Sequence, residues 1–257
     1  MAAFKNGVTN YDEWRDHSKD NGKYKSRMAV IVATMALAVL SLIDELKLVA
    51  QIVVSEMTGK LAGYYSVSTS VLMNKRCQER AKIPGSICAA CYAANTASRN
   101  SGLCQTLETN YIILNNFLIS EEAWATLSWP TTNGDGRIES FGDVDSVVCA
   151  RNYIRIIKTH PWINFGVWTK NVDLWIKAFI LEGGKPKNMK FIISSFLTNI
   201  KIRIKKEWLP YIDHRFTVYT PEFAREHGIV INCGGAKCAT CRNCYGGGPF
   251  DICEILK

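Results

Sequence analysis

NFGVWT at residues 164–169 and KFIISS at residues 190–195, with a helical stretch at 172–182 between them, decide the fold. Both segments are short and apolar, and they contain the β-branched and aromatic residues typical of buried strands. A strand, a helix and a second strand in this order predict a parallel βαβ unit.

The same alternation continues outward in both directions. Further strands are predicted at 64–71 (YYSVSTSV), 137–141 (RIESF), 216–219 (FTVY) and 229–232 (IVIN). Helices are predicted at 106–118, 121–127, 147–158, around 200–208 and at 221–227. This pattern predicts an α/β fold, built either as a partial (βα) barrel or as an open parallel sheet with helices. The sequence does not choose between the two architectures.

The N-terminal part has a different texture. Residues 1–27 are polar, and the pattern from residue 28 to about 57 is helical. The apolar run Met28–Ile43 has 16 residues and is followed by Asp44 and Glu45. Because a spanning helix needs about 20 apolar residues, we interpret the run as a buried helix, with a membrane-associated helix as the minor alternative. We therefore predict an N-terminal tail and helical extension at 1–60 and an α/β core with both cysteine groups at 61–257.

Composition excludes several classes of protein. Of the 257 residues, 47% are hydrophobic and 21% charged, which is the balance of a folded chain rather than a disordered one. The net charge of +8 is concentrated in part at residues 185–206, which we interpret as a solvated face rather than a nucleic-acid groove. The sequence contains no GxGxxG after a strand, no GxxxxGK[ST] and no GxSxG, which argues against the commonest nucleotide-binding and hydrolase classes.

Ten cysteines are bunched rather than spread, which favours metal binding in a reducing, cytoplasmic compartment over a disulfide framework. The C-terminal group is Cys233, Cys238, Cys241 and Cys244, with two successive CxxC spacings among glycines and with Cys253 as the alternative to Cys233 for the fourth ligand. Such spacing brings several thiolates to one centre and predicts a cysteine-rich metal-binding loop. An iron-sulfur cluster and zinc both accept four thiolates, so both stay open.

The N-terminal group is Cys77, Cys88 and Cys91, in the loop after the first predicted strand. Three thiolates leave one coordination position open, which is the arrangement that catalysis requires. Two alternatives are that Cys104 completes the site and that both groups share one zinc. Cys149 and Cys253, like Cys104, are otherwise interpreted as core or spare thiols.

Polar residues follow the predicted strands, at the edge where α/β proteins bind ligands. Glu139, Asp143 and Lys170 are the candidate catalytic residues. Ser140, Asn171 and Ser194 are the candidate cofactor-binding residues. The alternatives are structural: an internal Glu139–Lys170 ion pair, and Asp143 as the cap of the helix that begins near residue 147.

A strand, a loop with three cysteines and βα repeats together resemble the radical S-adenosylmethionine superfamily. That family's usual signature is CxxxCxxC, whereas here ten residues separate the first two cysteines and Tyr92 follows the last. The resemblance implies a 4Fe-4S cluster on Cys77, Cys88 and Cys91, with S-adenosylmethionine on its fourth iron. It also implies that Asp143 holds an amino group or ribose and that Lys170 neutralises a carboxylate or phosphate.

A second resemblance rests on four elements in the same order: SICAACYA at 86–93, RIESFGD at 137–143, WTKN at 168–171 and the terminal cysteines. Over residues 60–257 the chain is similar to the gene-product-eighty-eight-like family of bacteriophage proteins. This implies a phage origin and the cytoplasm of a bacterial host. We therefore expect an iron-sulfur enzyme of the radical S-adenosylmethionine type, with one or two clusters, acting on a small-molecule or nucleic-acid substrate. The alternative is a zinc-stabilised, non-catalytic phage protein that binds nucleic acid or protein.

Overall fold

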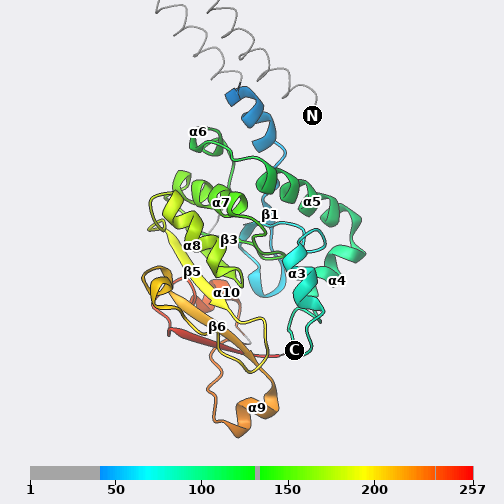
Figure 1. Ribbon diagram of the computed structural model, residues 1–257, viewed down its shortest axis with the longest axis vertical. Helices are drawn as coiled ribbons and strands as arrows, with labels where there is room; N and C mark the ends of the chain where they lie inside the picture. The colour runs from blue at the N-terminus through cyan, green and yellow to red at the C-terminus, as the bar shows by residue number, and fades with distance from the viewer. Residues whose placement is uncertain (1–40, 131–133, 235, 257) are drawn as a thin grey trace, which may run out of the picture. The chain divides into compact units, whose positions relative to one another are not determined.

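The computed structural model describes residues 41–130, 134–234 and 236–256 (Figure 1). The chain divides into two compact units, residues 1–44 and 45–257, so residues 45–60 belong to the larger unit. Residues 41–49 are helical. Most of the apolar run Met28–Ile43 lies outside the described residues. Within the described ranges, no helix is both long and apolar enough to cross a membrane.

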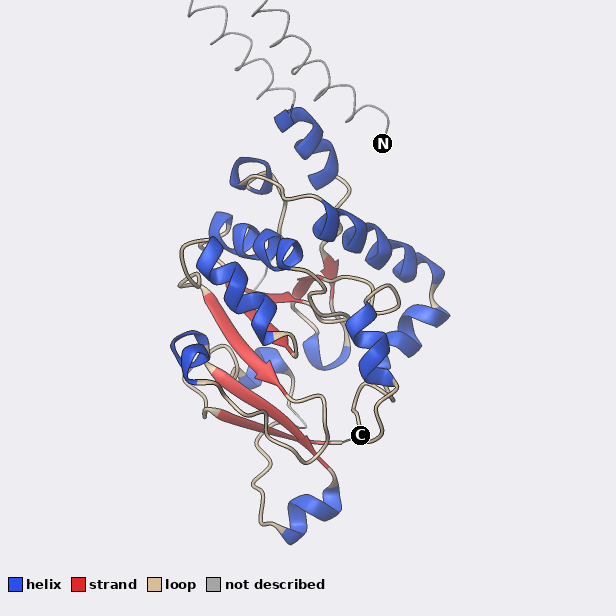
Figure 2. Cartoon of the chain, in the orientation of Figure 1, coloured by secondary structure: helices blue, strands red, loops and turns tan. Residues whose placement is uncertain are grey.

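One seven-stranded sheet organises the larger unit (Figure 2). Its strands are β1 (Ser55–Glu56), β2 (Tyr65–Val67), β3 (Asp135–Ile138), β4 (Asn164–Thr169), β5 (Met189–Ser194), β6 (His214–Tyr219) and β7 (Asp251–Ile255). They lie side by side in chain order, and every neighbouring pair is parallel except β1 with β2. The predicted α/β class is confirmed. The barrel is not, because β1 and β7 form the two edges of the sheet.

Helices connect the parallel strands. They are α3 (Lys75–Ala81), α4 (Tyr92–Arg99), α5 (Ser101–Asn116), α6 (Glu121–Trp124), α7 (Val147–Thr159), α8 (Val172–Leu181), α9 (Pro221–Glu226) and α10 (Cys238–Cys241), with the 3-10 helices η1 (Gly59–Leu61) and η2 (Lys206–Tyr211). Trp175 of α8 stacks on Tyr153 of α7 and contacts Phe191 of β5, and all three are fully buried. The apolar faces of α7 and α8 therefore form a core against one face of the sheet.

The C-terminal cysteine segment covers the other face. Neighbouring residues of a strand point to opposite faces of the sheet. In β4, Gly166 faces Tyr245 of this segment, because a side chain at position 166 would clash with the tyrosine. Tyr245 packs against Tyr64 and Trp168, and its hydroxyl donates to the Gly136 carbonyl over 3.2 Å. Gly166 leaves the space that this tyrosine fills, because a Cβ there would lie 2.8 Å from its ring.

The strand at 164–169 is confirmed with the predicted bounds, and α7 and α8 begin at the predicted residues. The predicted strand at 229–232 is wrong. Ile229 and Ile231 pack against the cluster of Tyr219, Ala224 and Cys253, but Val230 is 78% exposed. An isolated bridge from Cys233 to Glu254 follows the segment. The last strand of the sheet is β7 instead.

The predicted helix around 200–208 is also wrong. Residues 200–205 have no helical structure, and only η2 follows them. Asn199 adopts a left-handed backbone with φ 65°, and its side-chain oxygen accepts a hydrogen bond from the Thr220 amide over 2.8 Å. The chain therefore turns toward the end of β6 at the residue before the predicted helix, and residues 200–205 continue without helical structure.

Candidate functional site

A cavity of about 370 Å³ lies at the carboxyl ends of β3 and β4. Cys77 of α3 lines it, together with Cys88 and Cys91 from the loop before α4. Asp143 and Lys170, which follow β3 and β4, line the same cavity. The structure thus brings the whole first cysteine group to the strand ends, together with two of the three candidate catalytic residues.

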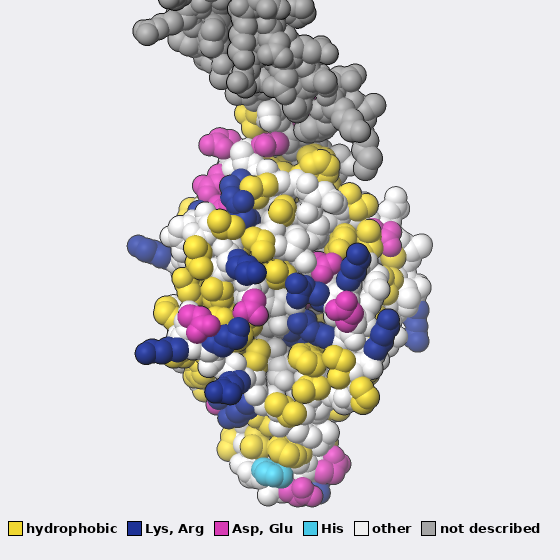
Figure 3. Space-filling view, in the orientation of Figure 1, with side chains coloured by type: hydrophobic (Ala, Val, Ile, Leu, Met, Phe, Trp, Pro, Cys, Tyr) yellow, Lys and Arg dark blue, Asp and Glu magenta, His cyan; other side chains and the backbone are white. Residues whose placement is uncertain are grey.

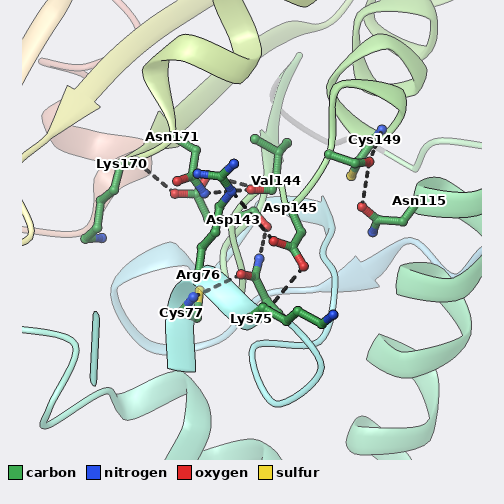
Figure 4. A network of polar contacts seen from close by, with 12 residues as sticks. Lys75, Arg76, Cys77, Asn115, Asp143, Val144, Asp145, Cys149, Lys170 and Asn171 are labelled. Atoms are coloured by element: carbon green, nitrogen blue, oxygen red, sulfur yellow. Dashed lines mark hydrogen bonds and ion pairs between the residues drawn. The ribbon is translucent and has the colours of Figure 1, made fainter. Parts of the chain in front are cut away.

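Asp143 is buried and joins the end of β3 to the end of β4 (Figure 4). Its Oδ1 accepts hydrogen bonds from the Thr169 hydroxyl over 2.7 Å and from its neighbour's amide over 2.9 Å, and its Oδ2 accepts from the Lys170 amide over 2.8 Å. Burial raises the pKa of Asp143, and the nearby Lys170 charge opposes the rise. Asp143 does not cap α7, because the cap is Ser146, whose hydroxyl accepts from the Cys149 amide.

Lys170 presents a charge to the cavity. Figure 4 shows its side chain pointing away from the Asp143 network. Burial raises the pKa of the Cys77 thiol, and the Lys170 charge is among the groups that oppose this rise. Within the described residues, the ammonium group has neither a hydrogen bond nor an ion pair. Lys170 is therefore placed to meet an anionic group that enters the cavity.

Glu139 lies behind the cavity instead of lining it. It is 3% exposed, and its carboxylate accepts from the Thr69 amide over 2.9 Å, the Thr69 hydroxyl over 2.6 Å and the Tyr153 hydroxyl over 2.8 Å. Its partners are thus Thr69 and Tyr153 rather than Lys170. Burial raises the pKa of Glu139 to about 7. This geometry fixes the loops after β2 and β3.

The three candidate cofactor-binding residues also lie outside the cavity lining. The Ser140 hydroxyl lies 3.0 Å from that of Ser68, and the Ser194 hydroxyl donates to the Ser195 carbonyl over 3.3 Å. The Asn171 amide nitrogen donates to the Val144 carbonyl over 2.6 Å. Each of these side chains forms a hydrogen bond within the loops that follow the strands, and these bonds stabilise the strand ends beside the cavity.

Arg80 of α3 is a cavity residue that the sequence analysis missed. Its Nη2 donates to the Lys170 carbonyl over 3.1 Å and to the Asn171 Oδ1 over 2.7 Å. Arg80 therefore holds the backbone from which Lys170 projects. The sequence could have indicated Arg80 as a cavity residue, because it follows Cys77 by three residues and residues three apart share a helix face.

The four cysteines of the C-terminal group line a second, smaller cavity of about 40 Å³. Cys238 and Cys241 belong to α10, whereas Cys233 precedes it and Cys244 follows it. Burial raises the pKa of the Cys233 and Cys238 thiols, and that of Cys244 to about 12. The Lys60 ammonium donates to the Cys233 sulfur over 3.1 Å, so a cation faces this group of thiols.

The two groups differ from the remaining cysteines. All ten are free thiols. Cys149 is buried in α7 and Cys253 in β7, and Cys104 of α5 lies 3.3 Å from the Glu108 carboxylate. Within the described ranges, no set of three or more His, Cys, Asp or Glu side chains stands ready to hold a metal ion. The predicted metal-binding loop is therefore not confirmed, although the four thiols that line the smaller cavity are ligands that thiophilic metals prefer.

The motif order and both cysteine groups match one family. The model of the family described as gene product 88 matches residues 47–247. The chain belongs to the gene product 88 family. The match begins 13 residues before the predicted start at residue 60 and includes both cysteine groups. No curated protein and no solved structure matches the chain. The gene product 88 resemblance is confirmed, and the radical S-adenosylmethionine resemblance stays a prediction.

Proposed function

We propose that this gene product 88 protein is an iron-sulfur enzyme of the radical S-adenosylmethionine type. The observation that supports it is the convergence of Cys77, Cys88 and Cys91 on one cavity at the carboxyl ends of parallel strands. These three thiols would hold a 4Fe-4S cluster, which supplies one-electron chemistry for the reductive cleavage of a sulfonium. The C-terminal cysteines would hold a second cluster or a zinc ion.

The chain's own residues would bind and orient the substrate. Lys170 neutralises a carboxylate or phosphate, and Arg80 fixes the Lys170 backbone through its carbonyl. Val71, Leu72 and Phe141 line the same cavity and keep water from the apolar part of a ligand. A cavity of about 370 Å³ falls within the range of small-molecule sites, so we propose a small anionic substrate or a single nucleotide.

The rival function, a zinc-stabilised nucleic-acid-binding protein, depends on the basic stretch at 185–206. Four of its lysines are paired with acids: Lys185 and Lys190 with Asp213, Lys201 with Asp251 and Lys205 with Asp173. Figure 3 shows basic and acidic side chains interspersed on the visible face. These pairs weaken the field that would attract a polyanion, which favours the enzyme.

Metal analysis of protein purified without oxygen tests the proposal. We expect about four or eight irons per chain and a broad visible absorption band that dithionite bleaches. Cys91→Ser should lose about four irons and all cleavage of S-adenosylmethionine. Cys104→Ser is the matched control and should keep both. Zinc alone, with no visible absorption in the wild type, would reject the enzyme and favour the rival.

A further inference from the structure

Arg137 is a partly buried cation on β3 that the proposed function does not use. Its guanidinium carbon Cζ lies over the Trp168 ring of β4, 3.3 Å from the ring centroid. Its Nε is buried and has no hydrogen-bond partner among the described residues. Within the described part of the chain, Arg137 forms no ion pair, whereas Arg215 contacts Asp251 at 2.6 Å and Arg155 contacts Glu182 at 3.1 Å.

This arrangement is costly for stability unless a ligand completes it. A buried donor without a partner loses the hydrogen bonds that it makes to water in the unfolded chain, and contact with the tryptophan ring offsets part of that loss. Contact with the ring restrains the guanidinium, and its Nε–H has no partner among the described residues. A planar fork held in this way is suited to a carboxylate or phosphate, which it binds through paired hydrogen bonds.

Arg137 lies between the two cysteine groups. Burial raises the pKa of the Tyr92 hydroxyl, and the Arg137 charge opposes that rise. The same charge opposes the rise that burial causes in the pKa of Cys244. Tyr92 follows Cys91 of the larger cavity, and Trp168 lines the smaller one. Arg137 lines neither cavity itself, but its guanidinium lies over Trp168, which lines the smaller one.

We propose that Arg137, placed over Trp168, is an anion-binding subsite that takes a carboxylate or phosphate group of a ligand lying on the sheet face that the C-terminal cysteine segment covers. The subsite is separate from the cysteine sulfurs, and it stands whether or not iron binds.

Thermal unfolding of the full chain with inorganic phosphate or acetate, each compared with chloride at equal ionic strength, tests the subsite. We expect one of the two anions to raise the Tm of the wild type by roughly 2–4 °C. Arg137→Met should abolish this rise, and Arg155→Met should keep it because Arg155 pairs with Glu182 elsewhere. A rise with phosphate assigns a phosphoryl group, and a rise with acetate assigns a carboxylate.

Stability without anions gives a second readout. Arg137→Met should unfold at or above the wild-type Tm, because it removes an unpaired charge, whereas Arg155→Met should unfold below it. If Arg137→Met does not fold, Arg137→Lys takes its place in the test. Lysine keeps the positive charge but cannot form paired hydrogen bonds, so this variant should lose at least half of the anion-induced rise in Tm. Equal rises in the wild type and the Arg137 variant, or no rise in either, overturn the subsite. The iron content should be the same in the wild type and in all Arg137 and Arg155 variants. If the metal analysis rejects the proposed iron-sulfur enzyme, the anion-binding result at Arg137 is therefore unaffected.

Discussion

Glu139 shows how a single buried residue couples the fold to pH. Its backbone is left-handed, with φ 55°, and burial raises its pKa from 4.5 to about 7 although Thr69 and Tyr153 donate to it. The ionisable groups that interact electrostatically with it include Asp143, Cys149, Tyr153 and Cys77. Because the pKa in the folded state lies above the ordinary value, the folded protein keeps a proton that the unfolded chain releases between these pH values. The stability that this carboxyl group contributes is full below pH 4.5 and is lost as the pH rises through about 7.

We predict that Glu139→Gln removes this pH-dependent part of stability. Its amide oxygen can accept from the Thr69 amide while its NH₂ donates to the two hydroxyls. In urea unfolding across this pH range, the wild type should lose roughly 2–4 kcal/mol more than the variant. Glu222→Gln, on the exposed first turn of α9, should follow the wild type. Parallel profiles for the wild type and Glu139→Gln would contradict the assignment.

The candidate site could be predicted only to the level of which residues gather at the strand ends. Asp143 and Lys170 were placed at the cavity correctly, because parallel strands end at a common edge. That the Asp143 oxygens are already bonded to the β4 end was not predictable, since those donors include backbone amides whose direction depends on the tertiary fold. Arg80 and Arg137 were missed for a related reason. Both act through partners far along the chain, and only Arg80 offered a spacing signal, its position three residues after Cys77.

Among the secondary-structure elements, α7 is anchored by one buried side chain. The Asn152 amide nitrogen donates to the carbonyls of Leu114 and Phe117 over 2.9 and 2.6 Å, at the end of α5. Its oxygen accepts from the Ile119 amide over 3.1 Å and from the Trp124 indole over 3.3 Å. One asparagine therefore satisfies four polar groups of the segment that joins α5 to α6.

We predict that Asn152→Leu, which keeps the size of the side chain, destabilises the protein by roughly 2–4 kcal/mol, because it leaves buried polar groups without partners. Denaturant unfolding measures the loss. The control is Asn116→Leu, since Asn116 is exposed and donates only to the Ile112 carbonyl. It should change stability by no more than about 0.5 kcal/mol. A loss in Asn152→Leu as small as in the control would contradict the anchoring role.

Periodicity identified the elements that bury a continuous apolar face and failed for those that do not. β4, α7 and α8 are such elements, and their starts were predicted correctly. β7 was missed because DICEI has only five residues, does not alternate regularly between charged and apolar residues, and follows a glycine-rich turn. The IVIN segment was mistaken for a strand because a short apolar run does not reveal whether a partner strand lies beside it.

At the scale of the whole molecule, the open sheet brings residues from its two edges together. Lys60 of η1 lies between β1 and β2, and Glu254 belongs to β7 at the opposite edge. The Lys60 ammonium nevertheless contacts the Glu254 carboxylate at 2.7 Å and the Cys233 sulfur at 3.1 Å. Burial alone would lower the pKa of Lys60, but these two partners reverse the effect and raise it. The cysteine segment is thus joined to both edges of the sheet.

A double-mutant cycle with Lys60→Met and Glu254→Gln measures this link between the edges. The side chains are only 30% and 21% exposed, so we predict a coupling free energy of roughly 1 kcal/mol in denaturant unfolding. The Lys60 contact with Cys233 cancels in the cycle, because it is lost in both variants that contain Lys60→Met. The reference is the Lys205–Asp173 pair, whose side chains are 51% and 66% exposed and whose coupling should be near zero. Equal couplings in the two cycles would show that the Lys60–Glu254 pair acts as an ordinary surface contact. A larger coupling for Lys60–Glu254 would show that residues far apart in the sheet order stabilise one folded unit.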